Sequence, residues 1–129
     1  MFERQVYISG TMVPESQARI SIFDSAVMLG DTATESTRTF GHHPFKLEEH
    51  IDRLYKSLKV MRIDPGMDAT EMLRTTQNVL QANLQCYAPD QDCWIVHNIS
   101  RGLSVPGSDP TLTSSGATVM IFTQFMCLR

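Results

Sequence analysis

One amphipathic stripe constrains the fold more than any other feature of the sequence. Apolar residues recur at alternating steps of four and three, the spacing of one face of an α-helix, at Leu47, Ile51, Leu54, Leu58 and Met61. Acidic residues open this segment and basic residues close it, which the helix dipole favours. The pattern predicts a helix over residues 47–62, stopped by Asp64-Pro65-Gly66, whose apolar face must be covered by a second layer.

A second helix is predicted to start after Asp68. Asp68 is a favourable N-cap, and Glu71 follows three residues later, as in a capping box. We expect the inner face of this helix to consist of Ala69, Leu73, Thr76, Leu80 and Leu84.

Runs of β-prone residues lie on both sides of the two helices. Residues 5–8 and 11–13 flank Ser9-Gly10 and predict a hairpin. The other predicted strands are 20–23, 32–40, 45–46 after a turn at 41–44, 93–100 and 117–125. An irregular stretch is expected from 24 to 31, and a mobile loop from 102 to 116. This order predicts an α+β domain, with a mostly antiparallel sheet and two helices packed on one face.

Composition excludes several classes of function. The chain has 129 residues, which fits one domain, and its net charge of -3 without a basic stripe disfavours nucleic acid and anionic membranes as partners. No apolar run is long enough to cross a membrane, and the first residues lack the pattern of a secretory signal. The three cysteines form no C-x-x-C pair, which favours free thiols in the cytoplasm. The histidines have no metal-ligand spacing, so we expect no metal site.

Six short segments carry an ordered pattern that extends over most of the chain. They are Tyr7-Ile8-Ser9-Gly10, Ala18-Arg19-Ile20-Ser21-Ile22-Phe23-Asp24, Leu29-Gly30-Asp31, Glu35-Ser36-Thr37-Arg38, Phe45-Lys46-Leu47-Glu48-Glu49-His50-Ile51-Asp52-Arg53-Leu54 and Ser100-Arg101-Gly102. In order and spacing they resemble the small N-terminal domain of class IV (fold-type IV) pyridoxal-phosphate aminotransferases, the family of branched-chain aminotransferases and D-amino-acid transaminases.

The resemblance implies a homodimeric two-domain enzyme that uses pyridoxal 5'-phosphate (PLP). Such an enzyme moves an amino group between an amino acid, branched-chain-like or a related amine, and a 2-oxo acid. Residues 1–125 would be the small domain and 126–129 the start of the interdomain linker, with the large domain absent. The family's Schiff-base lysine belongs to that large domain, and the lysines here lie at a helix junction or on a solvated helix face: Lys46, Lys56 and Lys59. We therefore expect the chain alone to be inactive.

The resemblance also implies roles for single residues of the long helix and the strand before it. Arg53 matches the arginine that binds the cofactor phosphate, a task suited to a planar and permanently charged guanidinium. His50 precedes Arg53 by three residues, on the same flank, and is a candidate for orienting it. Glu35 and Arg38 match positions near the pocket wall. Residues three apart on a strand point to opposite faces, so one of these two is expected to be structural.

The substrate pocket implied by the resemblance consists of Leu29, Thr34, Arg38, Trp94, Val96 and Arg101. Four of these depart from the branched-chain enzymes. Leu29 and Trp94 replace tyrosines, Thr34 replaces a phenylalanine, and Val96 replaces the arginine that binds the substrate carboxylate. These changes imply a different amino donor or a carboxylate held elsewhere. Arg101 is expected to hold the loop that covers the active site.

Three other interpretations remain open at this point. An aminodeoxychorismate lyase uses the same fold and cofactor to eliminate pyruvate. A stand-alone, non-catalytic module would dimerise or bind a partner, for which eight methionines offer adaptable surface. A fragment cut at the linker would expose the apolar face that the large domain normally covers, and would self-associate through it.

Overall fold

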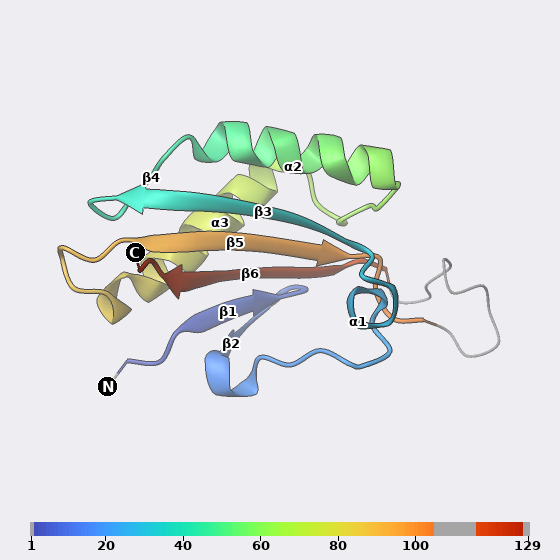
Figure 1. Cartoon of the computed structure of the whole chain (residues 1–129), viewed down its shortest axis with the longest axis horizontal. Coiled ribbons are helices and arrows are strands. Elements are labelled where there is room, and N and C mark those ends of the chain that lie inside the picture. Colours follow the sequence, from blue (N-terminus) through green and yellow to red (C-terminus); the bar gives the residue numbers. More distant parts are fainter. Residues whose placement is uncertain (1, 105–115, 128–129) are drawn as a thin grey trace.

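A single antiparallel sheet with two long helices on one face organises the chain (Figure 1). The computed structural model describes residues 2–104 and 116–127. Its elements are β1 (Gln5–Ile8), β2 (Thr11–Pro14), η1 (Glu15–Gln17), α1 (Ser25–Leu29), β3 (Thr32–Phe40), β4 (His43–Pro44), α2 (Leu47–Met61), α3 (Ala69–Asn83), η2 (Leu84–Cys86), β5 (Cys93–Ser100) and β6 (Thr118–Phe125).

The sheet has six strands in the order β2-β1-β6-β5-β3-β4, and every neighbouring pair is antiparallel. Helix α2 lies over β3, whereas α3 lies over β6 and β1. The predicted α+β architecture, with two helices on one face, is therefore confirmed. The opposite face of the sheet carries no long helix in the part of the chain that the structure describes (Figure 1).

The predicted stripe of α2 forms the centre of the core. Leu47, Ile51, Leu54 and Leu58 are buried against the inward residues of the sheet, among them Ile95. Burial of a leucine or isoleucine side chain contributes about 1.5–3 kcal/mol each. This stripe therefore accounts for much of the free energy that attaches α2 to β3 and β5.

Helix α2 ends earlier than predicted, through its own backbone and not at the proline. Arg62 adopts a left-handed conformation with φ of 56°. Its N–H donates to the Lys59 carbonyl at 3.2 Å, and the Ile63 N–H donates to the Leu58 carbonyl at 2.9 Å. These two bonds form a Schellman motif, and the buried Ile63 side chain supplies the apolar contact that accompanies it.

Helix α3 starts as predicted, because the Asp68 side chain accepts a hydrogen bond from the Glu71 N–H at 2.8 Å. Its buried face differs from the prediction by about one position. The residues that face inward are Met72, Thr76, Val79, Leu80 and Asn83. The reason is polar: the Asn83 side chain exchanges two hydrogen bonds with the Gln5 backbone, at 2.7 and 2.9 Å, and so serves β1 as a substitute strand partner.

Three local predictions on the edges of the domain were wrong. Residues 20–23 form no strand, because Ser21 closes a turn and its hydroxyl accepts from the Phe23 N–H at 3.0 Å. The stretch expected to be irregular contains α1, capped by the Asp24 side chain, which accepts from the Ala26 N–H. The return strand expected at 45–46 is β4, two residues earlier. The predicted mobile loop lies mostly outside the described residues.

His97 lies fully buried on β5 beneath α3. The Thr76 hydroxyl donates to the Met72 carbonyl at 2.7 Å, so its oxygen must accept from the His97 Nε2–H at 2.8 Å. The Nδ1 atom has no hydrogen-bond partner among the described residues. Burial therefore favours the neutral ring and lowers the pKa of His97 to about 4.

We predict that acid weakens the fold through His97. The unfolded chain, with an ordinary histidine pKa near 6.5, binds this proton while the folded chain does not, so the free energy of unfolding falls as pH drops from about 6.5 to about 4. The full effect is on the order of 3 kcal/mol. Urea unfolding of the wild type and His97→Gln at several pH values measures it. The variant should lose most of the slope in this window, and identical slopes would contradict the assignment.

Candidate functional site

Glu35 connects the edge strand β3 to one flank of α2. Its side chain is only 4% exposed and points to the helix-covered face, in line with the burial alternation of β3. Its carboxylate accepts hydrogen bonds from two helix residues, Arg53 and His50. A buried carboxylate is stable only when it is paired, and these two side chains supply the pairing.

The ion pair between Arg53 and Glu35 uses one edge of the guanidinium. The Arg53 Nε–H donates to both carboxylate oxygens at 3.1 Å, and Nη2 donates to Oε1 as well. The arginine side chain itself is 67% exposed, so its end faces solvent. The sequence placed Arg53 off the apolar stripe, and the structure shows how it is held there.

His50 binds the same carboxylate. Its Nδ1 lies 2.8 Å from Glu35 Oε1. Because a carboxylate can only accept, Nδ1 must carry the proton, whatever the state of the other nitrogen. The predicted link between His50 and Arg53 thus runs through Glu35, a hub that the family pattern had placed near the pocket wall.

Opposing effects act on the Glu35 carboxyl group. Burial raises the pKa of Glu35, whereas the hydrogen bonds and positive charge of Arg53 and His50 lower it, and the net result lies below its ordinary value. The carboxylate is therefore ionised at neutral pH. In return, Glu35 raises the pKa of the Arg53 guanidinium.

Four of the six predicted pocket residues share the helix-free face of the sheet. Strand register pairs Thr34 with Asn98 and Arg38 with Trp94, and Val96 lies between these two pairs on β5. Side chains two residues apart on a strand point to the same face, so Thr34, Arg38, Trp94 and Val96 lie on one surface. Glu35 lies on the opposite face of β3, as the three-residue spacing to Arg38 predicted.

Arg38 is half-buried and held by neighbours on its own end of the sheet. Its guanidinium stacks on Phe40, with 3.7 Å from Cζ to the ring centroid, and Nε donates to the Thr39 carbonyl at 3.1 Å. Its ion pair with Asp92 is long, at 3.9 Å. The aromatic ring and the carboxylate keep the cation on the helix-free face.

The other two predicted residues lie at the opposite end of the sheet. Leu29 is exposed at the end of α1. Arg101 forms an ion pair with Asp31 at 2.7 Å and donates to the carbonyls of Met61 and Arg62 at 2.9 and 3.0 Å. Arg101 therefore ties the end of β5 to the C-terminus of α2, where a cation also complements the helix dipole.

Sequence reasoning missed the role of Asp24. This fully buried carboxylate caps α1 and accepts the hydroxyls of Ser100 at 2.5 Å and Thr118 at 2.6 Å. It joins three segments that are distant in sequence. The available signal was the Asp-Ser pair before a short apolar run, which is an N-cap pattern.

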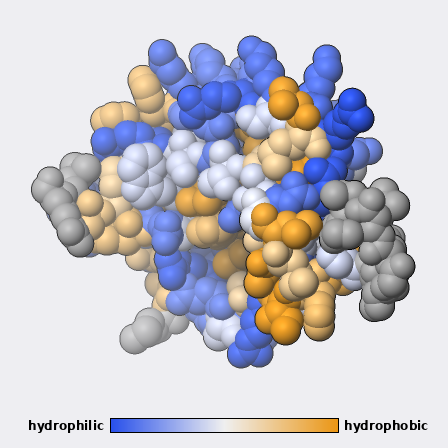
Figure 2. All heavy atoms as spheres, turned by 45° about the vertical axis from the view of Figure 1, so that its right-hand side comes forward, coloured by the Kyte–Doolittle hydropathy of each residue, from blue (hydrophilic) through white to orange (hydrophobic). Residues whose placement is uncertain are grey.

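Apolar side chains gather on the surface around α1. Figure 2, in which this end of the molecule is turned forward, shows them as a group. The exposed apolar residues here, which we call the α1 surface, are Ile20, Ile22, Phe23, Val27, Met28, Leu29 and Leu103. A pocket lined by Val6, Ile8, Ile20, Met120 and Phe122, together with Ala18 and Arg19, adjoins it on the helix-free face. Patches of this kind mark contact surfaces.

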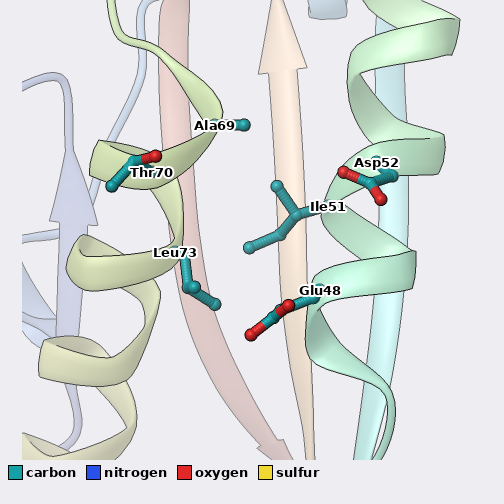
Figure 3. A pocket seen from close by; sticks show the side chains of 6 residues that line it. All are labelled: Glu48, Ile51, Asp52, Ala69, Thr70 and Leu73. Atoms are coloured by element: carbon teal, nitrogen blue, oxygen red, sulfur yellow. The ribbon is translucent and has the colours of Figure 1, made fainter.

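A groove between α2 and α3 lies away from all of these residues. It is lined by Glu48, Ile51, Asp52, Ala69, Thr70 and Leu73 (Figure 3). Its acidic residues lie on the flank of α2 that does not carry Arg53. The described part of the chain contains no cluster of side chains that could hold a metal ion, and none of its helices could span a membrane.

Comparison with known proteins identifies the class. The model of the amino-transferase class IV family, whose members use PLP, matches residues 32–125. A putative branched-chain-amino-acid aminotransferase of Methanocaldococcus jannaschii is 34% identical over 106 residues, which is 82% of this chain and 35% of that protein. The chain therefore belongs to the class IV aminotransferase family.

Other relatives and solved structures agree with this assignment. The aminodeoxychorismate lyase of Bacillus subtilis is 30% identical over 79% of the chain and 34% of its own length. A crystal structure of a branched-chain amino acid aminotransferase from the organism abbreviated T.th., complexed with N-(5'-phosphopyridoxyl)-L-glutamate, superposes with a TM-score of 0.78 at 26% identity, over 95% of this chain and 41% of that one. The chain thus spans about a third of its curated relatives.

We predict that Arg53→Met raises the pKa of Glu35. The variant removes the strongest of the interactions that lower this pKa but leaves the carboxyl buried. The side-chain carboxyl resonance of Glu35, followed by NMR as a function of pH, measures the change. Arg74→Met, which removes an exposed arginine from α3, should leave the titration of Glu35 as it is in the wild type. No difference between the two variants would contradict the pairing.

Proposed function

We propose that this chain is the small domain of a PLP-dependent aminotransferase, with residues 1–125 as the domain and 126–129 as the start of the linker. The single observation that carries the proposal is the outward guanidinium of Arg53, held at the edge of β3 by a buried carboxylate. The fold and family support it.

The residues present fit one half of a cofactor site. Arg53 is an exposed cation whose charge never titrates away, and this is what a phosphate group requires. PLP supplies an electron sink for amino-group transfer once it is held by a lysine amine. The lysines of the described chain are all exposed. We therefore assign the phosphate contact to Arg53, and the reactive amine to polypeptide outside these residues, so the chain alone is inactive.

The substrate side of the site is proposed on the helix-free face beside the same edge strand. Trp94 and Val96 offer apolar surface, and Arg38 is a cation on the same face, two positions along the sheet from Val96. This combination fits an amino acid with an apolar side chain, branched-chain-like or a related amine, together with a 2-oxo acid. Thr34 belongs to this wall, while Leu29 and Arg101 border it at the α1 end.

A second candidate is elimination of pyruvate from aminodeoxychorismate. The 30% identity to the Bacillus subtilis lyase supports it, since that value is close to the identity with the branched-chain relative. Both candidates use the same phosphate contact. The substrate and the lysine-bearing domain distinguish them, and the role of Arg53 is the same in each.

The α1 surface supports a proposal about partners. In the complete enzyme it is covered by the large domain or by the second subunit of a homodimer. A stand-alone module that binds a partner would use the same surface. The free thiols fit a cytoplasmic protein: Cys86, Cys93 and Cys127.

We expect Arg53→Ala to weaken PLP binding at least tenfold in a longer version of the protein that includes the lysine-bearing domain. A charge-assisted pair is worth about 1.5–3 kcal/mol, which corresponds to a tenfold or greater loss. PLP titration followed by absorbance measures it, with Arg74→Ala as the matched control. The 129-residue chain serves as an inactive blank. Unchanged affinity in Arg53→Ala would sink the assignment.

We also expect the chain alone to self-associate through the α1 surface. Sedimentation velocity at increasing concentration should show reversible oligomers. Replacing Phe23 and Met28 by serine should reduce association, because these exposed side chains would then no longer be buried between copies. Val60→Ser is the matched control, since Val60 is the most exposed of the large apolar residues and lies on α2, away from the α1 surface. A wild-type monomer at high concentration would contradict the proposal.

A further inference from the structure

The carboxylate of Glu35 leaves a defined part of the Arg53 guanidinium unused. An arginine has five N–H donors, of which Glu35 takes the Nε–H and one N–H of Nη2. Within the described part of the chain, no hydrogen bond uses Nη1. The end of the guanidinium, formed by Nη1 and the second N–H of Nη2, is therefore available to a ligand.

This available end matches a phosphate group. Two parallel N–H groups on a planar guanidinium pair with two phosphate oxygens. An exposed arginine normally samples many rotamers, and binding must then restrict it to one. Here the side chain is held before any ligand arrives, because Glu35 is buried on a strand and cannot follow the arginine into solvent.

A second contact keeps the carboxylate itself in place. His50 donates from Nδ1 to Oε1, the oxygen that also receives Nη2 of Arg53. On the neighbouring strand, His97 pairs in register with Glu35 and packs beneath α3. The carboxylate is thus fixed by a helix side chain and by the strand that carries it.

We propose that Glu35 is a positioning residue, which holds Arg53 side-on so that its Nη1/Nη2 edge faces outward as a preorganised fork for a phosphate monoester. The inference rests on the phosphate role of Arg53 proposed above, and adds to it the residue that makes this contact effective. Glu35 itself touches no ligand.

Charge and positioning predict opposite effects of the same substitution. Glu35→Gln removes a negative charge next to the anion site. If Glu35 acted on a bound anion only through its charge, phosphate would bind more tightly to the variant. If Glu35 positions Arg53, phosphate binds more weakly, because the neutral amide holds the guanidinium less firmly. The sign of the change therefore separates the two roles.

The experiment titrates inorganic phosphate into the 129-residue chain and follows the Nε–H signal of Arg53 by NMR. We expect the wild type to bind, and Glu35→Gln to bind about tenfold more weakly, as expected for loss of one charge-assisted hydrogen bond. Its Nε–H signal should also move toward the position of a solvated arginine. Glu35→Asp keeps the charge but withdraws the carboxylate, and should weaken phosphate binding too.

Thr37→Val is the matched control. Thr37 is the next inward-facing residue of β3, fully buried, and its hydroxyl has no hydrogen-bond partner among the described residues. The substitution preserves volume and should leave phosphate affinity unchanged. Backbone amide spectra establish that each variant is folded, and Glu35→Asp provides the test if Glu35→Gln is not.

The outcomes separate this inference from the proposed function. Equal phosphate affinity in Arg53→Ala and the wild type would overturn the phosphate role of Arg53, and the fork with it. Loss of binding in Arg53→Ala, with unchanged or tighter binding in Glu35→Gln, would overturn only the positioning role of Glu35. A wild-type chain whose Arg53 signal does not respond to phosphate would also overturn the preorganised fork.

Discussion

The pairing of a buried carboxylate on β3 with two side chains of α2 is the interaction on which the site depends. The apolar stripe attaches α2 to the sheet, but a stripe of leucines tolerates small shifts of the helix. Glu35 adds a directional constraint, since its oxygens must meet Arg53 and His50 or remain buried without partners. The same contact that orients the helix on the sheet therefore also orients the proposed phosphate ligand.

Two further polar links act at the other end of the sheet. Asp24 joins α1 to the ends of β5 and β6. Arg101 joins β5 to Asp31 and to the last carbonyls of α2. These links hold a short helix whose outer side is apolar and exposed, and this explains how the α1 surface stays ordered without a cover (Figures 1 and 2). A rigid support beneath an apolar surface is suited to contact with another domain or subunit.

Alternation along a single edge strand divides the two halves of the proposed site. Residues of β3 that face the helices include Glu35, and those that face away include Thr34 and Arg38. Beyond the short pairing with β4, the described residues leave this strand at the edge of the sheet. A cofactor phosphate at Arg53 and a substrate beside Trp94 would lie on two sides of one strand.

The sequence by itself determined the elements whose signals are local. The stripe of α2, the Asp68 cap of α3, the first hairpin and the long strands all follow from periodicity, capping and β-branched content, which act over a few residues. Tertiary structure decided what depends on partners distant in the chain. Asn83 faces inward because a backbone edge at Gln5 needs its amide, residues 20–23 stay unpaired because no strand lies beside them, and Asp24 is buried because two hydroxyls from other strands meet it. Motif resemblance picked out Arg53, but only the fold revealed that Glu35 holds it, because a hydrogen bond between a strand and a helix leaves no periodic trace in the sequence.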